Sequence, residues 1–274
     1  MFLINGQFSE SLSVQDRGLH YGDGLFETLA VQQQQLLCWD KHYDRLKTGC
    51  FRLGMECPPA DLLMSEAAQI YAQADYSVLK IILTRGQGSR GYRLPDKNNP
   101  QTRILASYPW PDFPANNSVT GVTVRFCKTQ LGYNPQLAGI KHLNRLEQVL
   151  ARSEWDDPGI AEGLMRDTRN CIIEGTMSNL FIIRGNQLLT PDLTGCGIAG
   201  TIRECVLDLA ENLGLQVSIT ALTDADLYAA DEMFLCNSVI GIWPVCQLEQ
   251  HALSPGPWSI KIRDKLIHGK MIAQ

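Results

Sequence analysis

The sequence lacks the regularly spaced ligands of a metal site. Its nine cysteines form no C-x-x-C pair, and its five histidines contain no H-x-x-x-H spacing. Zinc sites are built from such pairs, and small disulfide-rich domains from an even set of cysteines, so neither class is predicted. Scattered thiols are instead typical of a reducing compartment.

Long hydrophobic runs and basic clusters are also missing. No apolar stretch is long enough to cross a bilayer, and the first residues lack the basic start and apolar core of a secretory signal. The formal net charge is -5, from 24 basic and 29 acidic residues. Nucleic-acid binding needs a clustered basic surface, which this sequence does not predict. We therefore expect a cytoplasmic protein with neither a membrane nor a nucleic-acid partner.

Short extended and helical patterns alternate along the 274 residues, a length that accommodates two modest domains. Asn5-Gly6 predicts a tight hairpin, and Gly54 a helix end. Three prolines between positions 109 and 114 favour a linker. The predicted α+β protein has a smaller N-terminal domain, a linker and a larger C-terminal domain, at residues 1–108, 109–117 and 118–274. Further strands are predicted at residues 26–31, 36–39, 77–84, 103–107, 119–127, 163–165, 179–183 and 233–236, and helices at 42–53, 60–74, 142–152 and 202–213.

A glycine-rich segment, Gly86-Gln87-Gly88-Ser89-Arg90-Gly91, matches the G-x-G-x-x-G pattern of dinucleotide-binding proteins. That function requires a helix to begin at the glycines, so that its N-terminus faces the pyrophosphate. Here the chain continues with Tyr92-Arg93-Leu94-Pro95, which does not predict a helix. We interpret the segment as a flexible active-site or surface loop.

A lysine at a loop-to-helix junction is the main candidate for chemistry. Lys141 follows a Pro- and Gly-containing loop and precedes a predicted amphipathic helix with Leu143, Leu146, Val149 and Leu150 on one face. An apolar setting of this kind lowers the pKa of an amine and makes it a nucleophile toward an aldehyde. A solvated lysine at a helix start is the common alternative, because lysine is rarely buried.

The neighbourhood of Lys141 and five other segments, in order, carry a wider pattern. The five are DRGLHYGDGLFET at residues 16–28, HYDRL at 42–46, IEGTMSNLF at 173–181, GIAGTIR at 197–203 and ADEMF at 230–234. Together they resemble the fold-type IV family of pyridoxal-phosphate enzymes, the class IV aminotransferases. The resemblance implies a two-domain, D-amino-acid aminotransferase-like fold, with a small N-terminal α/β domain and a C-terminal domain that has a barrel-like sheet and carries the lysine. It also implies a homodimer with a pocket near the subunit interface.

The resemblance implies roles for particular residues. Lys141 forms a Schiff base with pyridoxal 5'-phosphate and then serves as general acid and base. Glu174 keeps the pyridine nitrogen protonated through a charge-assisted hydrogen bond. The phosphate is bound by Arg45, by the helix start at Thr201 and Ile202, whose free N-H groups suit an anion, and by Ser238. Taken singly, Glu174 and Arg45 would be read as solvated side chains.

Within the family, residues 1–6, 85–92, 134–150 and 231–245 most resemble the 4-amino-4-deoxychorismate lyases, which release p-aminobenzoate and pyruvate for folate synthesis. Two alternatives stay open: a D- or branched-chain amino-acid aminotransferase, and a dimeric binding protein that keeps the fold without the chemistry. The presence of Lys141 and Glu174 speaks against the second. Arg90 or Arg93 is expected to meet substrate carboxylates. The other substrate contacts that the resemblance implies are Tyr21, Phe26, Thr28 and Tyr92.

Overall fold

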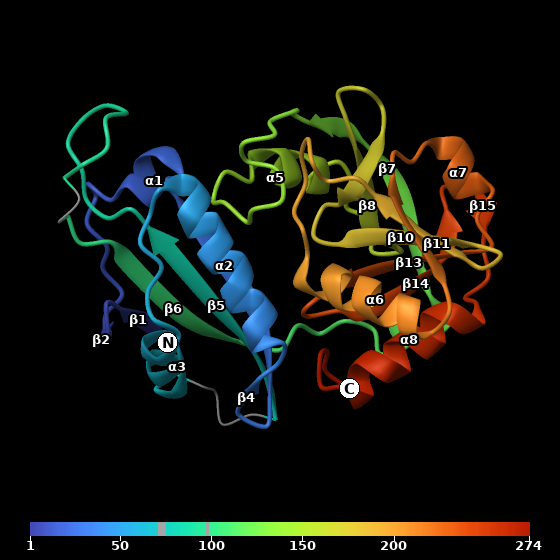
Figure 1. Ribbon diagram of the computed structural model, residues 1–274, viewed down its shortest axis with the longest axis horizontal. Helices are drawn as coiled ribbons and strands as arrows, with labels where there is room; N and C mark the ends of the chain where they lie inside the picture. The colour runs from blue at the N-terminus through green and yellow to red at the C-terminus, as the bar shows by residue number, and fades with distance from the viewer. Residues whose placement is uncertain (71–74, 97–98) are drawn as a thin grey trace. The chain divides into compact units, whose positions relative to one another are not determined.

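The chain forms two compact units in a computed structural model that describes residues 1–70, 75–96 and 99–274 (Figure 1). Unit 1 consists of Met1–Pro111 and Ile140–Asn144, and unit 2 of Asp112–Gly139 and Arg145–Gln274. The sequence predicted two consecutive domains, with Lys141 in the second. The structure differs at Ile140–Asn144, because this segment makes its contacts with unit 1.

Unit 1 is built on a six-stranded antiparallel sheet with the order β2-β1-β6-β5-β3-β4. The predicted hairpin is confirmed, because Asn5 and Gly6 both have positive φ between β1 and β2, as the tight turn requires. The predicted helix ending at Gly54 is also confirmed, and the second predicted helix ends within its expected range, of which residues 71–74 lie outside the described residues. The elements are β1 (Phe2–Ile4), β2 (Gln7–Phe8), α1 (Arg17–Tyr21), β3 (Gly24–Gln32), β4 (Gln35–Leu36), α2 (Trp39–Leu53), α3 (Ala60–Ala68), β5 (Tyr76–Thr84) and β6 (Thr102–Pro109).

Unit 2 is built on a nine-stranded mixed sheet. Its strands run in the order β12-β11-β10-β13-β14-β7-β8-β9, with β15 paired to β14. The sheet curls, so that β9 at one end also approaches β10 and β11, which gives the half-barrel shape that the family resemblance implied. The elements are α4 (Asn117–Thr120), β7 (Val122–Leu131), α5 (Leu146–Arg152), β8 (Ile160–Asp167), β9 (Ile172–Gly175), β10 (Asn179–Arg184), β11 (Gln187–Pro191), α6 (Thr201–Asn212), β12 (Gln216–Thr220), α7 (Asp224–Tyr228), β13 (Glu232–Asn237), β14 (Gly241–Leu248), β15 (His251–Ala252) and α8 (Pro257–His268).

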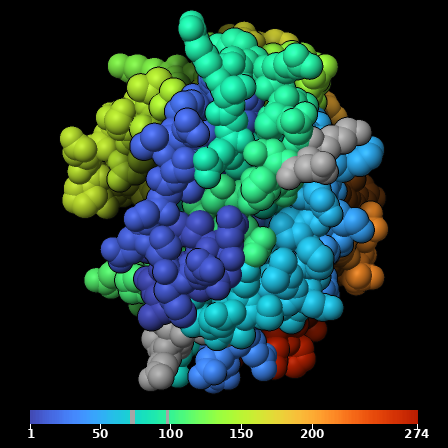
Figure 2. Space-filling view, turned by 90° about the vertical axis from the view of Figure 1, so that its left-hand side faces the viewer, coloured from blue at the N-terminus to red at the C-terminus, as the bar shows by residue number. Residues whose placement is uncertain are grey.

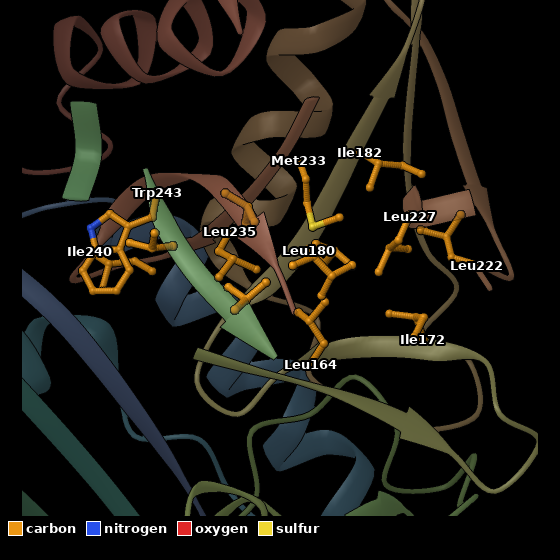
Figure 3. Packing of buried hydrophobic residues seen from close by; sticks show 14 residues of the cluster. Leu164, Ile172, Leu180, Ile182, Leu222, Leu227, Met233, Leu235, Ile240 and Trp243 are labelled. Atoms are coloured by element: carbon orange, nitrogen blue, oxygen red, sulfur yellow. The ribbon is translucent and has the colours of Figure 1, made fainter. Parts of the chain in front are cut away.

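The core of unit 2 lies inside this curl. Figure 3 shows Leu164 of β8, Leu180 of β10 and Leu235 of β13 directed toward one another. All three side chains are completely buried, and burial of this kind stabilises a fold by about 1.5–3 kcal/mol for each large apolar side chain. Helices α6 and α8 pack on the outer side of the same sheet, against β13 and β14. The curled sheet is therefore a rigid frame for the loops that leave its strands.

One predicted helix begins later than expected. The pattern indicated a helix over residues 142–152, but α5 begins at Leu146. Residues 141–143 are instead extended and hydrogen-bonded to β3. The expected apolar face also does not enter a core, since Leu146, Val149 and Leu150 are 76%, 60% and 58% exposed. Periodicity alone could not distinguish an apolar face that meets the core from one that lies on the surface.

Candidate cofactor site

Lys141 lies on a short extended segment that continues the sheet of unit 1. The backbone N-H of Phe26 donates to the carbonyl of Lys141 at 2.9 Å, and the N-H of Leu143 donates to the carbonyl of Gly24 at 3.0 Å. Asn144 also donates through its side chain to the carbonyl of Gly22 at 3.1 Å. These bonds on β3 hold the lysine backbone in place. Its ammonium nitrogen Nζ is 4.5 Å from the centre of the Phe26 ring, within cation–π distance.

A second ammonium group, that of Lys80, also lies over the Phe26 ring. Nζ of Lys80 on β5 is 5.3 Å from the centre of the Phe26 ring, and Lys80 is the cross-strand partner of Thr28. Phe26 and Thr28 are both half-buried and, two residues apart on β3, share one face of the sheet. The sequence analysis selected Phe26 and Thr28 but missed Lys80, because a lysine in an apolar strand gives no signal until its cross-strand partner is known.

Glu27, between these two residues, faces α2 and binds two side chains of that helix. Nε of Arg45 donates to Glu27 Oε1 at 2.8 Å and Nη2 to Oε2 at 2.5 Å, while Nδ1 of His42 lies 2.6 Å from Oε2. His42 and Arg45 are three residues apart, so one turn of α2 presents both to the same carboxylate. The histidine and the arginine of the HYDRL segment therefore both bind the buried Glu27 carboxylate. The role of Arg45 as a phosphate ligand stays a prediction.

Burial and charge act in opposite directions in this network. Burial alone would raise the pKa of Glu27, but the Arg45 guanidinium and the bond to His42 lower it to about 2. Burial lowers the pKa of His42, and the positive charges of Arg45 and Lys141 lower it further. The bond to Glu27 raises this pKa, but the net shift is downward. The ionised carboxylate is thus matched to one guanidinium, with a neutral imidazole beside them.

In unit 2, Glu174 is a buried carboxylate at the end of β9. Its Oε2 accepts the backbone N-H of Ile198 at 2.8 Å. The preceding residue, Gly197, has φ +83°, and the N-H of Gly139 donates to its carbonyl at 2.8 Å. The turn that precedes α6 is thereby tied both to Glu174 and to the chain just before Ile140–Asn144. The charge of Glu174 also acts on Arg145. Burial lowers the pKa of Arg145, and the charges of Glu174 and Glu147 raise it without cancelling that decrease.

The turn after Glu174 is held by a second buried acid, Glu162 of β8. Its carboxylate accepts the N-H and the hydroxyl of Thr176, the N-H of Met177 and the hydroxyl of Ser178 at 2.5–3.1 Å. Asn179, the next residue, donates from Nδ2 to the carbonyl of Ile198 at 2.9 Å. The serine and asparagine of the IEGTMSNLF segment therefore position the Glu174 strand and the turn beyond it. Sequence reasoning missed Glu162, which is remote from that segment.

The start of α6 has the features of an anion site. Gly200 is the N-cap, so the N-H groups of the first turn point out of the N-terminal end of the helix. Oγ1 of Thr201 lies 3.3 Å from Oγ of Ser238, which follows β13. A side chain at position 200 would collide with Asn179, since a Cβ there would be 2.0 Å from Asn179 Oδ1. A twelve-residue helix start with two hydroxyls fits a phosphate group, and it gathers the predicted residues Thr201, Ile202 and Ser238.

Arg203, also in this turn, has a structural role. Its Nε donates to Thr190 Oγ1 at 3.2 Å and its Nη2 to the carbonyl of Pro191 at 3.0 Å. The late ADEMF segment is similarly structural. The Glu232 carboxylate accepts the N-H groups of Trp258 and Ser259 at 3.0 and 2.9 Å, and so caps α8.

The remaining predicted substrate residues lie on the glycine-rich loop of unit 1 or, in the case of Tyr21, at the end of α1 in contact with that loop. The hydroxyl of Tyr21 accepts the N-H of Gly91 at 3.1 Å, and the rings of Tyr21 and Tyr92 are 5.4 Å apart. Arg90 and Arg93 are exposed. In its described part, residues 86–96, the loop forms no helix, as the sequence predicted. Its glycines serve other needs: Gly86 and Gly91 have φ of +81° and +100°.

No group of three or more His, Cys, Asp or Glu side chains that could hold a metal ion occurs in the described ranges. Within the same ranges, no helix is both long and apolar enough to cross a membrane. All nine cysteines are free thiols.

Comparisons with known proteins point to one family. The family model for amino-transferase class IV matches residues 24–248. Aminodeoxychorismate lyase of Vibrio harveyi is 34% identical over 245 residues, which cover 89% of this chain and 90% of that protein. The crystal structure of 4-amino-4-deoxychorismate lyase from Pseudomonas aeruginosa has a TM-score of 0.94 at 43% identity, with 99% and 100% of the two chains covered. A branched-chain amino-acid aminotransferase of Escherichia coli shares the fold, with a TM-score of 0.87 at 22% identity and coverage of 99% and 94%.

Proposed function

This chain belongs to the class IV aminotransferase family of pyridoxal-phosphate enzymes, and we propose that its reaction is that of a 4-amino-4-deoxychorismate lyase. The reaction converts 4-amino-4-deoxychorismate to p-aminobenzoate and pyruvate in folate biosynthesis. The observation that carries this proposal is the similarity to two lyases, at 34% and 43% identity over nearly the full chain. The aminotransferase reading rests on more distant relatives, such as D-alanine aminotransferase of Bacillus licheniformis at 27% identity.

The described side chains fit the cofactor that the family uses. Lys141 would bind its aldehyde carbon. Glu174, buried and ionisable, would hold a proton on the pyridine nitrogen. The N-H groups of Thr201 and Ile202, with the hydroxyls of Thr201 and Ser238, would bind its phosphate, and Arg45 would add a guanidinium. When bound, the cofactor supplies an electron sink for the breaking of a C-H bond.

The chain's own contribution to the chemistry is a proton transfer by Lys141. Its amine takes the proton from the ring carbon of the substrate that bears the amino group. The electron pair of that C-H bond forms the new ring double bond, and the C-O bond at the neighbouring carbon breaks, so the enolpyruvate oxygen leaves with its electron pair. Protonation of the enolpyruvate carbon gives pyruvate. Because the ring becomes aromatic, the enzyme needs mainly orientation and one positioned base.

Substrate recognition is assigned to unit 1. The substrate carries carboxylates, and unit 1 supplies cations in Lys80 and in Arg90 or Arg93. Lys80 is the cross-strand partner of Thr28 and lies over the Phe26 ring, and Tyr21 at the end of α1 contacts Tyr92 on the loop that carries Arg90. These residues combine an apolar surface for the ring with charges for its acids.

We also propose that the enzyme is a cytoplasmic homodimer, with its pocket near the subunit interface. The nine free thiols agree with a reducing compartment. The exposed leucine and valine side chains of α5 form an apolar surface beginning five residues after Lys141. A second copy of the chain is the occupant expected from the family, and apolar helix faces of this kind are typical of permanent interfaces.

The decisive experiment supplies enzymatically made 4-amino-4-deoxychorismate and measures both products. We expect p-aminobenzoate and pyruvate in equal amounts, and no product from Lys141→Ala, which should also lose the yellow colour of the lysine-bound cofactor. A colourless variant with full activity would refute the role of Lys141. Accumulation of the pyridoxamine form with an amino-acid donor would favour an aminotransferase. Failure of borohydride to fix the cofactor on Lys141 would favour a binding protein.

A further inference from the structure

The glycine-rich loop is held in place by one buried arginine. Arg17, in α1, is 4% exposed although it carries a charge. Its Nε donates to Asp23 Oδ2 at 2.8 Å, and its Nη1 donates to the carbonyls of Gly91 and Arg93 at 3.1 and 3.5 Å. The guanidinium carbon is 4.9 Å from the centre of the Tyr21 ring. A buried guanidinium that bonds a loop backbone fixes the path of that loop.

The backbone around Arg17 holds the other end of the loop. The N-H of Arg17 donates to the carbonyl of Gly86 at 2.8 Å, and the N-H of Gly88 donates to the carbonyl of Gln15 at 3.2 Å. A Cβ at position 88 would be 2.8 Å from Cδ of Arg17, so glycine permits this close approach. The loop therefore lies against the arginine from residue 86 to residue 93, and the surface view has teal loop residues beside the dark blue N-terminal residues (Figure 2).

The helix that carries Arg17 is itself bonded to the sheet of unit 1. The buried carboxylate of Asp16 accepts the N-H of Gly18 at 2.8 Å and the hydroxyls of Thr84 and Thr102 at 3.0 and 2.6 Å. Asp23 also accepts two bonds from Nε of Arg85, at 2.8 and 3.1 Å. Burial raises the pKa of Asp23, but its bonds to Arg85 and Arg17 lower it overall. The ends of β5 and β6 thus fix α1, and Arg17 connects α1 to the loop.

We infer that Arg17 is a positioning residue for substrate binding: it fixes the loop so that Arg90 and Tyr92 are presented in one arrangement. This inference rests on the proposed function, which makes those two residues substrate contacts. Among the described residues, the Arg17 guanidinium bonds the loop backbone and Asp23 and lies over the Tyr21 ring. Its removal should therefore change the affinity for substrate more than the chemical step. Because Asp23 keeps its bonds to Arg85, the loss of Arg17 leaves no unpaired buried acid.

The test compares Arg17→Ala with Arg52→Ala, which removes an exposed arginine from the end of α2 in the same unit. The first readout is the rate of tryptic cleavage of the holoenzyme after Arg90 and Arg93, located by mass spectrometry. We expect Arg17→Ala to raise this rate about tenfold, because cleavage reports how often the loop leaves its place. The second readout is steady-state kinetics with 4-amino-4-deoxychorismate. We expect KM to rise about tenfold with kcat within about threefold and the cofactor absorbance unchanged.

A second variant approaches the same contact from the loop. Gly88→Ala places a methyl group against Arg17 and should give the same rise in cleavage and in KM. In the double variant, Arg17→Ala with Gly88→Ala, the arginine side chain no longer occupies the place of the new methyl group. Gly88→Ala should therefore add little to the effect of Arg17→Ala on cleavage and KM. Unchanged cleavage and KM in Arg17→Ala would overturn the inference, as would faster cleavage with an unchanged KM, or a lower kcat with lost cofactor absorbance. If the wild-type enzyme does not turn over this substrate, the proposed function fails, and the cleavage rates alone then decide whether Arg17 holds the loop.

Discussion

The guanidinium of Arg45 on α2 donates a hydrogen bond to each carboxylate oxygen of Glu27 on β3, at 2.8 and 2.5 Å. Glu27 is buried and Arg45 is half-buried, and the pair joins the helix to the strand that also carries Phe26 and Thr28. Helix and sheet of unit 1 are therefore joined by a charged contact at Glu27, next in sequence to Phe26, whose ring centre lies 4.5 Å from the Lys141 amine.

Glu27→Gln should lower the stability of the enzyme in a pH-dependent way. The pKa of Glu27 falls from its usual 4.5 to about 2 in the folded chain. Its stabilisation is therefore present above about pH 4.5 and is lost as the pH falls toward 2. At pH 7 the shift corresponds to about 3 kcal/mol in the free energy of unfolding. Urea unfolding at pH 7, 5 and 3 checks this. Glu56→Gln, an exposed glutamate of unit 1, is the control, and a wild-type advantage independent of pH would contradict the prediction.

Thr201→Val and Ser238→Ala should each weaken pyridoxal-phosphate binding about tenfold, because each removes a hydroxyl from the start of α6. Binding of pyridoxal, which has no phosphate, should change much less. Absorbance titration of the apoenzyme with both compounds measures the two affinities. Ser153→Ala, on the surface of unit 2, is the matched control. Equal losses for both compounds would show that these hydroxyls do not bind the phosphate.

Glu162→Gln should destabilise the turn that follows Glu174. The buried carboxylate accepts four hydrogen bonds from residues 176–178, and an amide would turn one oxygen into a donor that faces other donors. We expect a loss of about 3 kcal/mol in the free energy of unfolding, together with weaker cofactor absorbance. Chemical denaturation compared with Glu211→Gln, an exposed glutamate of α6, provides the measurement. If Glu162→Gln were as stable as Glu211→Gln, Glu162 would not be what holds the turn at residues 176–178.

Leu146→Glu should weaken self-association of the enzyme. This side chain is the most exposed of the α5 apolar surface, and a buried charge at an interface costs several kcal/mol. Sedimentation velocity should show a dimer for the wild type and a monomer at the same concentration for the variant. Phe51→Glu removes another exposed apolar side chain, from α2, and should stay dimeric. A wild type that sediments as a monomer would refute the proposed homodimer.

Local sequence signals predicted the parts of the fold that depend on local physics. Asn5-Gly6 and Gly54 adopt the positive φ that their turns require, and the start of α6 follows its glycine. The segments around Arg45, Glu174 and Thr201 also form the helix, the strand and the helix start that were expected. Both parts were readable because each signal lies within a few residues of the structure that it specifies.

The rest depends on contacts between distant residues. Nothing near Lys141 indicates that its segment is extended, because its hydrogen-bond partners lie more than one hundred positions earlier, at Gly24 and Phe26. Glu162 and Lys80 have no local signal for the same reason. The glycines of the 86–91 loop matched a nucleotide pattern by composition, whereas Gly88 is required by the side chain of Arg17. Such requirements appear only once the tertiary structure is known.

The membership of Ile140–Asn144 in unit 1 has a consequence for how this gene can be divided. A fragment ending at Pro111 would leave the N-H of Phe26 and the carbonyl of Gly24 without their native partners along an open strand edge, which invites aggregation. The complementary fragment would contain the lysine without the strand that orders it. We therefore expect neither fragment to fold without the other, because the hydrogen bonds that order the lysine segment join residues from both.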